Sequence, residues 1–392
     1  MSARDRPVTG GSGPLDGYRI LDFSIALTGP YAVALLADQG ASVIKVERPG
    51  IGDVARWIGV SVNRMSAFFL ACNRGKRSIV LDLQQPEGAQ LARRLATDVD
   101  VVVQNYRPGV MDRLGLGYEA IREINPEVVY VSLSGYGPVG PYRDRPAYDT
   151  AIQAYGGFAA NQADPEDGAP VFLRQTAADK VTALYASQAI TAALLARERG
   201  QGGQHVQLSM ADSVVSFLWA EAAGNEVLLD ADGSAHSSFT AGFSPFRFRD
   251  GWGIAVPTTV EDFSGMCKAL GVVGYDDPRI ATIEERQRHR DVTEALMDMC
   301  YAMAANLTMA EASARFEQQR VPFAMVLSSA EIVDDPQAVA MEMFEVRQHP
   351  IAGRTRLPRH PARFAKTPAS LAGNAPGLGD RIGELRARGV VG

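Results

Sequence analysis

Short strand-like runs alternate with helix-forming segments along the first half of this chain, and this alternation limits the possible folds more than any other feature. The runs are RILDFS at 19–24, ASVIKVE at 41–47, DVVVQN at 100–105, VVYVSLSG at 128–135 and GQHVQLSM at 203–210. Helices are expected from Pro30 to Gly40, over 86–96, as two short pieces within 109–124, and from Asp179 to Arg199. Strands that alternate with helices predict an α/β fold with a Rossmann-like parallel sheet covered on both faces.

The pattern changes along the chain in a way that predicts several domains. Residues 1–14 are polar and rich in glycine, and we expect a flexible tail there. Residues 15–225 hold the strand–helix alternation of a large domain, and 226–330 resemble a smaller α+β domain. The segment 331–392 contains a helical DDPQAVAMEMF and a stretch rich in Pro and Arg at 350–368 with little periodicity. A segment of that composition is expected to pack across another surface, so we predict that it returns to the large domain.

Composition excludes several classes of protein. The net charge of −6 over 392 residues argues against a nucleic-acid partner, which usually selects a basic surface. No apolar run reaches the ~18 residues of a membrane span, so no membrane partner is expected. The three cysteines, Cys72, Cys267 and Cys300, are far apart and odd in number, which favours a reducing cytoplasm over a disulfide framework.

The usual cofactor and nucleophile motifs are absent. The turn after the first strand reads SIALTGPY, without the G-x-G-x-x-G of dinucleotide binding, and no G-x-x-x-x-G-K-[ST] phosphate loop occurs. The five histidines form no H-x-x-H or H-x-E pair, and His205 is expected to be a satisfied residue of a strand. There is also no G-x-S-x-G elbow. No metal site and no permanently bound cofactor are therefore expected.

Basic residues gather next to the predicted strands. Arg48 follows the second strand, NRGKR at 73–77 precedes SIVLDL, NYRPG at 105–109 follows DVVVQN, and Arg113 lies one helical turn further on. Ligands of open α/β sheets bind at the carboxyl ends of the strands, where guanidinium groups hold phosphates. Solvated surface charge is the alternative, and the pattern itself leaves both interpretations open.

One carboxylate, Asp179 in TAADKV at 176–181, is placed at the start of the longest predicted helix. Thr176 and Asp179 fit the S/T-x-x-acid pattern of a helix N-terminus, which favours a capping role. The helix dipole is expected to keep this carboxylate ionised near neutral pH, so it can also attack a carbonyl carbon. Local sequence alone favours the cap.

Longer segments resemble the class III CoA transferases, the family of formyl-CoA and carnitine CoA transferases that also contains 2-methylacyl-CoA racemase. The segments that carry the resemblance are LDGYRILDFS at 15–24, ALLADQGASVIKVERPG at 34–50, NRGKRSIVLDL at 73–83, NYRPGVMDRLGLGYEAI at 105–121, INPEVVYVSLSGYGPVGP at 124–141, PAYDTAIQAYGG at 146–157, AADKVTALYA at 177–186, GQHVQLSMAD at 203–212 and VPFAMVLSSAEIVDDPQ at 321–337. The resemblance implies an interlocked homodimer in which each chain threads through the other.

The resemblance also implies roles for particular residues. The family's catalytic aspartate falls on Asp179, and its CoA contacts fall on Arg48, Asn105, Tyr106, Arg107, Arg113, Tyr148 and Asp149. It implies transfer of CoA from an acyl-CoA to a small carboxylic acid through an aspartyl anhydride and an aspartyl-CoA thioester, with CoA as substrate rather than resident cofactor.

Two departures from family relatives bear on the reaction. Racemase relatives carry a His–Asp pair where this chain has Tyr148–Asp149, and racemisation needs a second acid/base group, so transfer is favoured over racemisation. Formyl-CoA enzymes carry a Gln at the position of Leu27, which makes formyl-CoA and oxalate less expected as substrates. A racemase and a non-catalytic acyl-CoA sensor are the alternatives. Donor and acceptor acids are not identified by the sequence.

Overall fold

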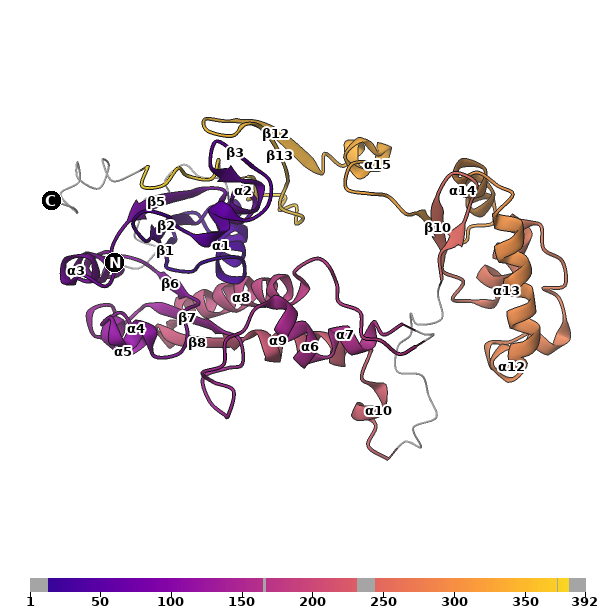
Figure 1. Ribbon diagram of the computed structural model, residues 1–392, viewed down its shortest axis with the longest axis horizontal. Coiled ribbons are helices and arrows are strands. Elements are labelled where there is room, and N and C mark those ends of the chain that lie inside the picture. Colours follow the sequence, from indigo (N-terminus) through magenta and orange to yellow (C-terminus); the bar gives the residue numbers. More distant parts are fainter. Residues whose placement is uncertain (1–12, 165–166, 231–243, 372, 381–392) are drawn as a thin grey trace. The chain divides into compact units, whose positions relative to one another are not determined.

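The computed structural model describes residues 13–164, 167–230, 244–371 and 373–380 (Figure 1). The chain divides into two compact units, one made of Met1–Ser237 with Glu342–Gly392 and the other of Ser238–Met341. The sequence prediction places the corresponding divisions at 226 and 331. Each unit has its own hydrophobic core, so each is described by itself.

A six-stranded parallel sheet forms the centre of the first unit, in the order β5-β2-β1-β6-β7-β8. Its strands are β1 (Arg19–Asp22), β2 (Ser42–Glu47), β5 (Lys76–Val80), β6 (Val101–Gln104), β7 (Val129–Ser134) and β8 (Gln204–Ser209). The predicted parallel α/β sheet is confirmed. The first strand ends at Asp22, earlier than the predicted run 19–24, because the backbone of Ser24 bonds to the side chains of Asp22 and Lys45 instead of a neighbouring strand.

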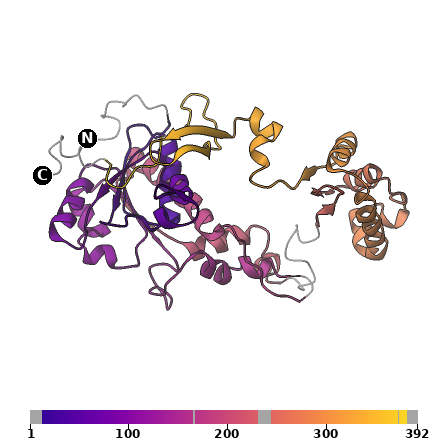
Figure 2. The same ribbon diagram turned by 45° about the horizontal axis from the view of Figure 1, so that its top comes forward.

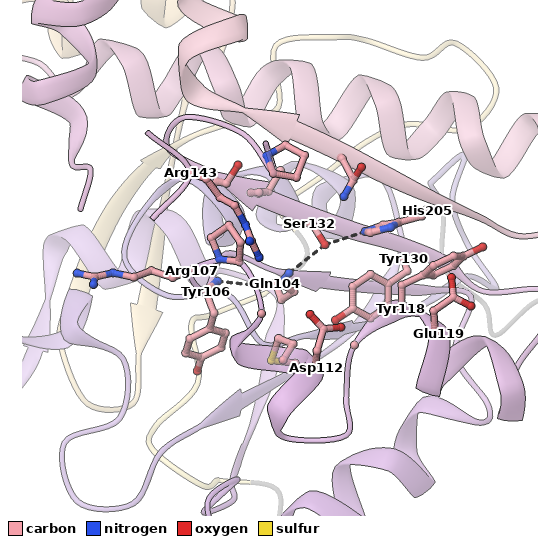
Figure 3. Close-up of a pocket in the computed structure, with 18 residues that line it drawn as sticks. Gln104, Tyr106, Arg107, Asp112, Tyr118, Glu119, Tyr130, Ser132, Arg143 and His205 are labelled. Carbon is pink, nitrogen blue, oxygen red and sulfur yellow. Dashed lines mark hydrogen bonds between the residues drawn. The ribbon is translucent and has the colours of Figure 1, made fainter. Parts of the chain in front are cut away.

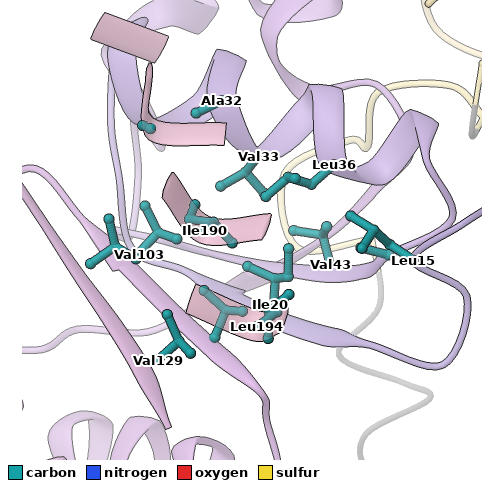
Figure 4. Close-up of a cluster of buried hydrophobic side chains, with 14 of the residues drawn as sticks. Leu15, Ile20, Ala32, Val33, Leu36, Val43, Val103, Val129, Ile190 and Leu194 are labelled. Atoms are coloured by element: carbon teal, nitrogen blue, oxygen red, sulfur yellow. The ribbon is translucent and has the colours of Figure 1, made fainter. Parts of the chain in front are cut away.

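Helices cover both faces of this sheet (Figure 2). One face packs against α1 (Thr28–Asp38) and α8 (Ala177–Ala196), and the other against α3 (Pro86–Ala96), α4 (Val110–Arg113) and α5 (Tyr118–Ile124). Figure 4 shows the core on the first of these faces, where Val33 and Leu36 of α1 meet Ile190 and Leu194 of α8 over the strands. The α3 helix spans the residues that the sequence predicts.

The α8 helix approaches α1 closely because its buried face is built from small residues. Ala183, Ala186 and Ala193 are almost fully buried, and Ile190 fills the space between them and the sheet. Alanine carries no side-chain entropy cost and lets two helix backbones come together. The two helices consequently run side by side along one face of the sheet.

The remaining elements of the first unit are short. They are η2 (Val54–Trp57), β3 (Ser61–Val62), β4 (Met65–Ser66), α2 (Ala67–Asn73), α6 (Asp149–Gly156), α7 (Phe158–Asn161), η3 (Arg197–Gln201), α9 (Met210–Trp219), α10 (Gly224–Val227), β12 (Phe344–His349) and β13 (Gly353–Pro358). The stretch 350–368, which shows little periodicity in sequence, contains β13, and β13 pairs with β12 in an antiparallel hairpin. Ile351 and Ala352 in the hairpin turn pack against the cluster around Met65 and Phe69. The turn of the hairpin therefore packs against residues of the first unit.

The second unit combines helices with a three-stranded antiparallel sheet in the order β11-β10-β9. Its elements are β9 (Phe246–Arg247), β10 (Trp252–Ala255), α11 (Val260–Leu270), η4 (Pro278–Ile280), α12 (Ile283–Arg288), α13 (Arg290–Ala304), α14 (Met309–Gln318), β11 (Phe323–Met325), η5 (Ile332–Asp334) and α15 (Pro336–Ala340). Cys267 of α11 and Cys300 of α13, distant in sequence, lie with their sulfur atoms 3.9 Å apart in its core. None of the helices among the described residues combines the length and apolarity that crossing a bilayer needs.

Candidate active site

Asp179 lies where two helices begin at the same edge of the parallel sheet. The α1 helix follows β1 and α8 leads into β8, so both helix N-termini lie at the carboxyl ends of the strands. Thr28, the first residue of α1, donates a hydrogen bond from its hydroxyl group to Oδ1 of Asp179. This is the edge at which open α/β sheets bind ligands.

Burial sets the charge state of Asp179. Loss of water raises the pKa of this carboxyl from 3.8 to about 6, the hydroxyl and backbone N–H of Thr28 oppose the rise, and the nearby charge of Asp149 adds to it. The net shift of the pKa is upward, opposite to the direction that a helix dipole alone would give. The carboxylate is nevertheless mostly ionised at pH 7, as the sequence predicts.

Asp149, and not Asp179, accepts a backbone hydrogen bond at the start of α8. The backbone N–H of Asp179 donates to Oδ1 of Asp149 at 3.0 Å, while Gln153 Nε2 donates to Oδ2 of Asp149 at 2.6 Å. Thr176, the N-cap residue, makes no side-chain capping bond, so the capping role predicted from the local pattern is wrong. The carboxylate of Asp179 consequently does not cap its own helix, α8.

Asn105 fixes the segment that leads from β1 to α1. Its Oδ1 accepts from the backbone N–H of Ile25 and its Nδ2 donates to the Ile25 carbonyl, both at 2.8 Å. Position 29 requires glycine, because a Cβ atom there would lie 2.3 Å from Cβ of Ser24. The bare glycine lets the start of α1 lie directly against this segment, and this places Thr28.

Arg48 and Tyr106 line a small pocket of ≈ 100 Å³ beside the same segment. Its other lining residues are Ile25, Val46, Glu47, Gly52, Asp53 and Val54. Arg48 is exposed and donates to the Gly52 carbonyl at 3.2 Å, and burial raises the pKa of the Tyr106 hydroxyl. The structure therefore brings together Arg48 and Tyr106, which are distant in sequence.

Tyr106 also borders a second pocket of ≈ 230 Å³, shown in Figure 3, with Arg107 and Arg143 among its lining residues. Inside it, Gln104 accepts from the backbone N–H of Tyr106 at 2.8 Å and donates to Ser132 Oγ at 2.9 Å. His205 Nε2 lies 2.9 Å from the same Oγ. His205 is thus a partnered residue in a pocket wall, half-buried, rather than a fully buried core residue.

Two arginines converge on Gly109. A Cβ atom at this position would lie 3.4 Å from Nη1 of Arg113 and 3.9 Å from Nη2 of Arg143. Gly109 has φ = 81°, a conformation that favours glycine. Two guanidinium groups near one backbone position offer several N–H donors, and this arrangement is suited to a phosphate.

Two cations of the basic run 73–77 form ion pairs inside the fold. Arg74 forms a buried ion pair with Asp38 at 2.7 Å, and Lys76 forms another with Asp22 at 2.8 Å. Both cations are buried and paired with carboxylates, so they are neither solvated surface charges nor contacts for a phosphate. Tyr148, in contrast, is 82% exposed at the start of α6.

A model of the family described as CoA-transferase family III matches residues 15–381. The chain belongs to this family. It is 34% identical to succinyl-CoA:glutarate CoA-transferase of Mus musculus over 93% of this chain and 84% of that protein. It is also 34% identical to succinate–glutarate CoA-transferase of Agrobacterium fabrum, over 95% of each chain.

A solved structure agrees with the sequence relatives. The crystal structure of a CAIB/BAIF family protein from Brucella suis matches with a TM-score of 0.84 and 31% identity, over 96% of this chain and 99% of that one. As a family III CoA-transferase, the chain acts on CoA thioesters. The described residues contain no group of three or more His, Cys, Asp or Glu side chains that could hold a metal ion.

Sequence reasoning about this CoA-transferase missed Thr28, Arg143 and the Lys45–Asp53 ion pair. A charged lysine inside the β-branched run of β2 was the available signal for Lys45, since a buried lysine needs a partner. Thr28 stands at a strand-to-helix turn, where hydroxyl groups commonly meet ligands or caps. Their contacts with residues distant in sequence had no local signal.

Proposed function

We propose that this family III CoA-transferase moves CoA between carboxylic acids with Asp179 as its covalent nucleophile. The observation that carries the proposal is the carboxylate at the paired N-termini of α1 and α8, held by Thr28 and free of capping. Its pKa of about 6 leaves it ionised at neutral pH yet less stabilised by water than an exposed aspartate. Such a group is suited to attack a thioester carbonyl.

The proposed reaction consists of carboxylate exchanges. Asp179 attacks the carbonyl carbon of the donor acyl-CoA, the C–S bond breaks, and a mixed anhydride and CoA thiolate form. The thiolate then attacks the aspartyl carbonyl, which releases the donor acid and gives an aspartyl-CoA thioester. The acceptor carboxylate attacks this thioester, and the thiolate that leaves attacks the acyl carbonyl of the second anhydride. The new acyl-CoA forms and the Asp179 carboxylate is regenerated.

Arginine side chains are the proposed contacts for the CoA phosphates. Arg48 and Arg107 follow β2 and β6 at the edge where Asp179 lies, and Arg113 ends the next helix, α4. Arg143 is added because it converges with Arg113 on Gly109. Guanidinium groups bind phosphate oxygens through two parallel hydrogen bonds. We assign Tyr106 and Tyr148 to the same CoA surface, and Asn105 and Asp149 to the support of Thr28 and Asp179.

Dicarboxylic acids are the first acceptors to test. Relatives of this chain are named for succinyl-CoA with glutarate, D-citramalate or L-malate, and all of these acids carry two carboxylates. A panel of acyl-CoAs incubated with small mono- and dicarboxylic acids, read by mass spectrometry, identifies the pair that exchanges fastest. A 2-methylacyl-CoA in the panel also tests racemisation, which needs an acid/base group opposite Asp179.

A homodimer is proposed from the apolar surface of α8 and α9. Leu184 and Leu195 of α8 are 55% and 50% exposed, and Phe217 of α9 is 51% exposed. Tyr185 Oη lies 3.2 Å from Ser216 Oγ, so these two helices present adjoining faces. A helix that is apolar on several faces usually packs against more than one partner, and a second copy of this chain in an interlocked arrangement is the proposed one.

Isotope transfer tests the covalent proposal directly. The acceptor acid is labelled with ¹⁸O in both carboxylate oxygens, and the enzyme is digested after turnover. The proposed exchange leaves one ¹⁸O in the Asp179 carboxylate and one in the carbonyl of the new acyl-CoA. A protein whose Asp179 peptide stays unlabelled while acyl-CoA product accumulates does not use this intermediate.

A further inference from the structure

The segment from β1 to α1 is held by the side chains of other elements, and an ion pair is at its centre. Lys45 of β2 and Asp53 are both fully buried, and Nζ of Lys45 lies 2.8 Å from Oδ2 of Asp53. The same Nζ donates to the Ser24 carbonyl at 2.7 Å, and Asp53 Oδ1 accepts from the backbone N–H of Ala26 at 2.9 Å. One buried ion pair therefore bonds to the segment at two points.

Ala26 is held in an unusual backbone conformation between these bonds. Its φ is 64°, in the left-handed region that residues with side chains rarely adopt. Such a conformation persists only where the surroundings over-determine it. The bonds from Asp53 to Ala26 and from Asn105 to Ile25 supply that constraint. Two residues further on, Thr28 starts α1 and bonds to Asp179.

We propose that the Lys45–Asp53 ion pair is a positioning device that sets the hydroxyl of Thr28 against the carboxylate of Asp179. The proposal rests on the role of Asp179 as nucleophile. Lys45 and Asp53 act through the backbone of residues 24–28 and are positioning residues. The small pocket beside Arg48 is lined by Ile25 of this segment and by Asp53 of the ion pair, so the pair also forms part of a wall of the proposed CoA site.

The charges around the pair favour its ionised form. Lys45 faces Asp53, Asp22 and Glu47, which together hold its pKa above the ordinary value although burial opposes them. Glu47 also accepts from the backbone N–H of Asp53 at 2.9 Å. The other two carboxylates have a second cationic partner each. Asp22 pairs with Lys76, and Glu47 pairs with Arg56. The pair is thus part of a connected network of buried charges.

The test replaces both charges, Lys45→Met with Asp53→Asn, which avoids leaving one buried charge unpaired. Asn at 53 still accepts from Ala26, but Met at 45 donates nothing to Ser24, so the segment loosens. The pKa of the Asp179 carboxyl is measured by NMR on protein with labelled aspartate, assigned with Asp179→Asn. Loss of the Thr28 bond is expected to raise this pKa above about 6, by about one pH unit, and to lower kcat about 10²-fold.

The matched control is a buried ion pair at the opposite end of α8. Arg197 Nη2 lies 3.0 Å from Asp100 Oδ1, next to the start of β6. Arg197→Met with Asp100→Asn is expected to lower stability while the Asp179 pKa and kcat stay at wild-type values. If both double variants behave alike, the Lys45–Asp53 pair serves folding only and the proposal is overturned.

Thr28→Val gives a second test that leaves the ion pair intact and nearly preserves side-chain volume. It is expected to raise the Asp179 pKa in the same direction, and an unchanged pKa would overturn the proposed route even if the double variant fails to fold. The NMR titration does not depend on turnover. A raised pKa in these variants together with full activity in Asp179→Asn would refute the nucleophile while leaving the positioning contact established.

Discussion

The backbone N–H of Asp179 donates a hydrogen bond to the carboxylate of Asp149, 3.0 Å away, although the two residues lie thirty positions apart in the chain. Asp149 therefore supports the first turn of α8, and Asp179 points its own carboxylate to Thr28. Asp149 and Asp179 therefore differ in role, because only Asp149 accepts a hydrogen bond from the backbone of α8.

Asp149→Asn is predicted to shift the pH profile. The Asn side chain keeps the acceptor for the Asp179 N–H, but the negative charge that raises the Asp179 pKa is lost. Activity of the wild type is expected to fall as pH drops through about 6, where Asp179 is protonated. In the variant this acidic limb of kcat/KM moves to lower pH, by about one pH unit or less. A limb that stays in place would show that another group controls it.

Asp179→Asn is predicted to abolish transfer while leaving CoA affinity nearly unchanged, because an amide cannot form the anhydride. Asp212 in the first turn of α9 provides a matched control, since it and Ser209 bond each other at the start of that helix. Asp212→Asn should cost at most about 1 kcal/mol of stability and retain transfer. Steady-state assays of both purified variants decide between the two roles.

The same Asp179→Asn change is predicted to stabilise the fold at neutral pH. A carboxyl whose pKa rises from 3.8 in the unfolded chain to about 6 in the folded one destabilises the folded state once it ionises. The difference in free energy of unfolding should reach roughly 2–3 kcal/mol above pH 6, fall to about 0.5 kcal/mol at pH 4 and vanish well below the unfolded-state pKa of 3.8. Denaturant titrations at pH 4 and pH 8 measure it. Equal stability of variant and wild type at pH 8 would contradict the burial argument.

Arg143→Ala is predicted to weaken CoA binding by about 1–3 kcal/mol, the scale of a charge-assisted hydrogen bond. Arg145 is the control, because its guanidinium group lies 3.7 Å from the ring centre of Tyr142 instead of at Gly109. Calorimetry should find a loss in affinity for Arg143→Ala and for Arg113→Ala that Arg145→Ala does not share. Unchanged affinity in a folded Arg143→Ala variant would remove this residue from the CoA site.

A charge on the exposed face of α8 is predicted to disturb the proposed dimer. Leu195→Glu places a carboxylate on a side chain that is half exposed in the single chain and is expected to be covered in a homodimer. Light scattering over a dilution series should report a dimer for wild type and a smaller species for the variant. Val273→Glu, on an exposed apolar residue of the second unit, is the control. A wild-type monomer at every concentration would refute the dimer.

The sequence by itself determined the parallel α/β sheet, the bounds of α3 within 86–96, and the placement of Arg48, Asn105 and Arg107 just after strands. These features follow from local periodicity, because the alternation of side chains along a strand and the spacing of apolar residues in a helix are written in neighbouring positions. The family resemblance added a role for Asp179, which local sequence alone assigns to a cap.

Only the tertiary structure decided which partner each of these groups meets. Asp149 accepts the backbone hydrogen bond at the start of α8, and Thr28 donates to Asp179. Lys45 is buried in an ion pair with Asp53 instead of facing solvent. The pairing of β12 with β13 also had no periodic signal in the stretch 350–368. The physical reason is that these contacts join residues far apart in sequence. A hydrogen bond or ion pair depends on the distance between two atoms, and that distance exists only once the sheet has brought its strand ends to one edge.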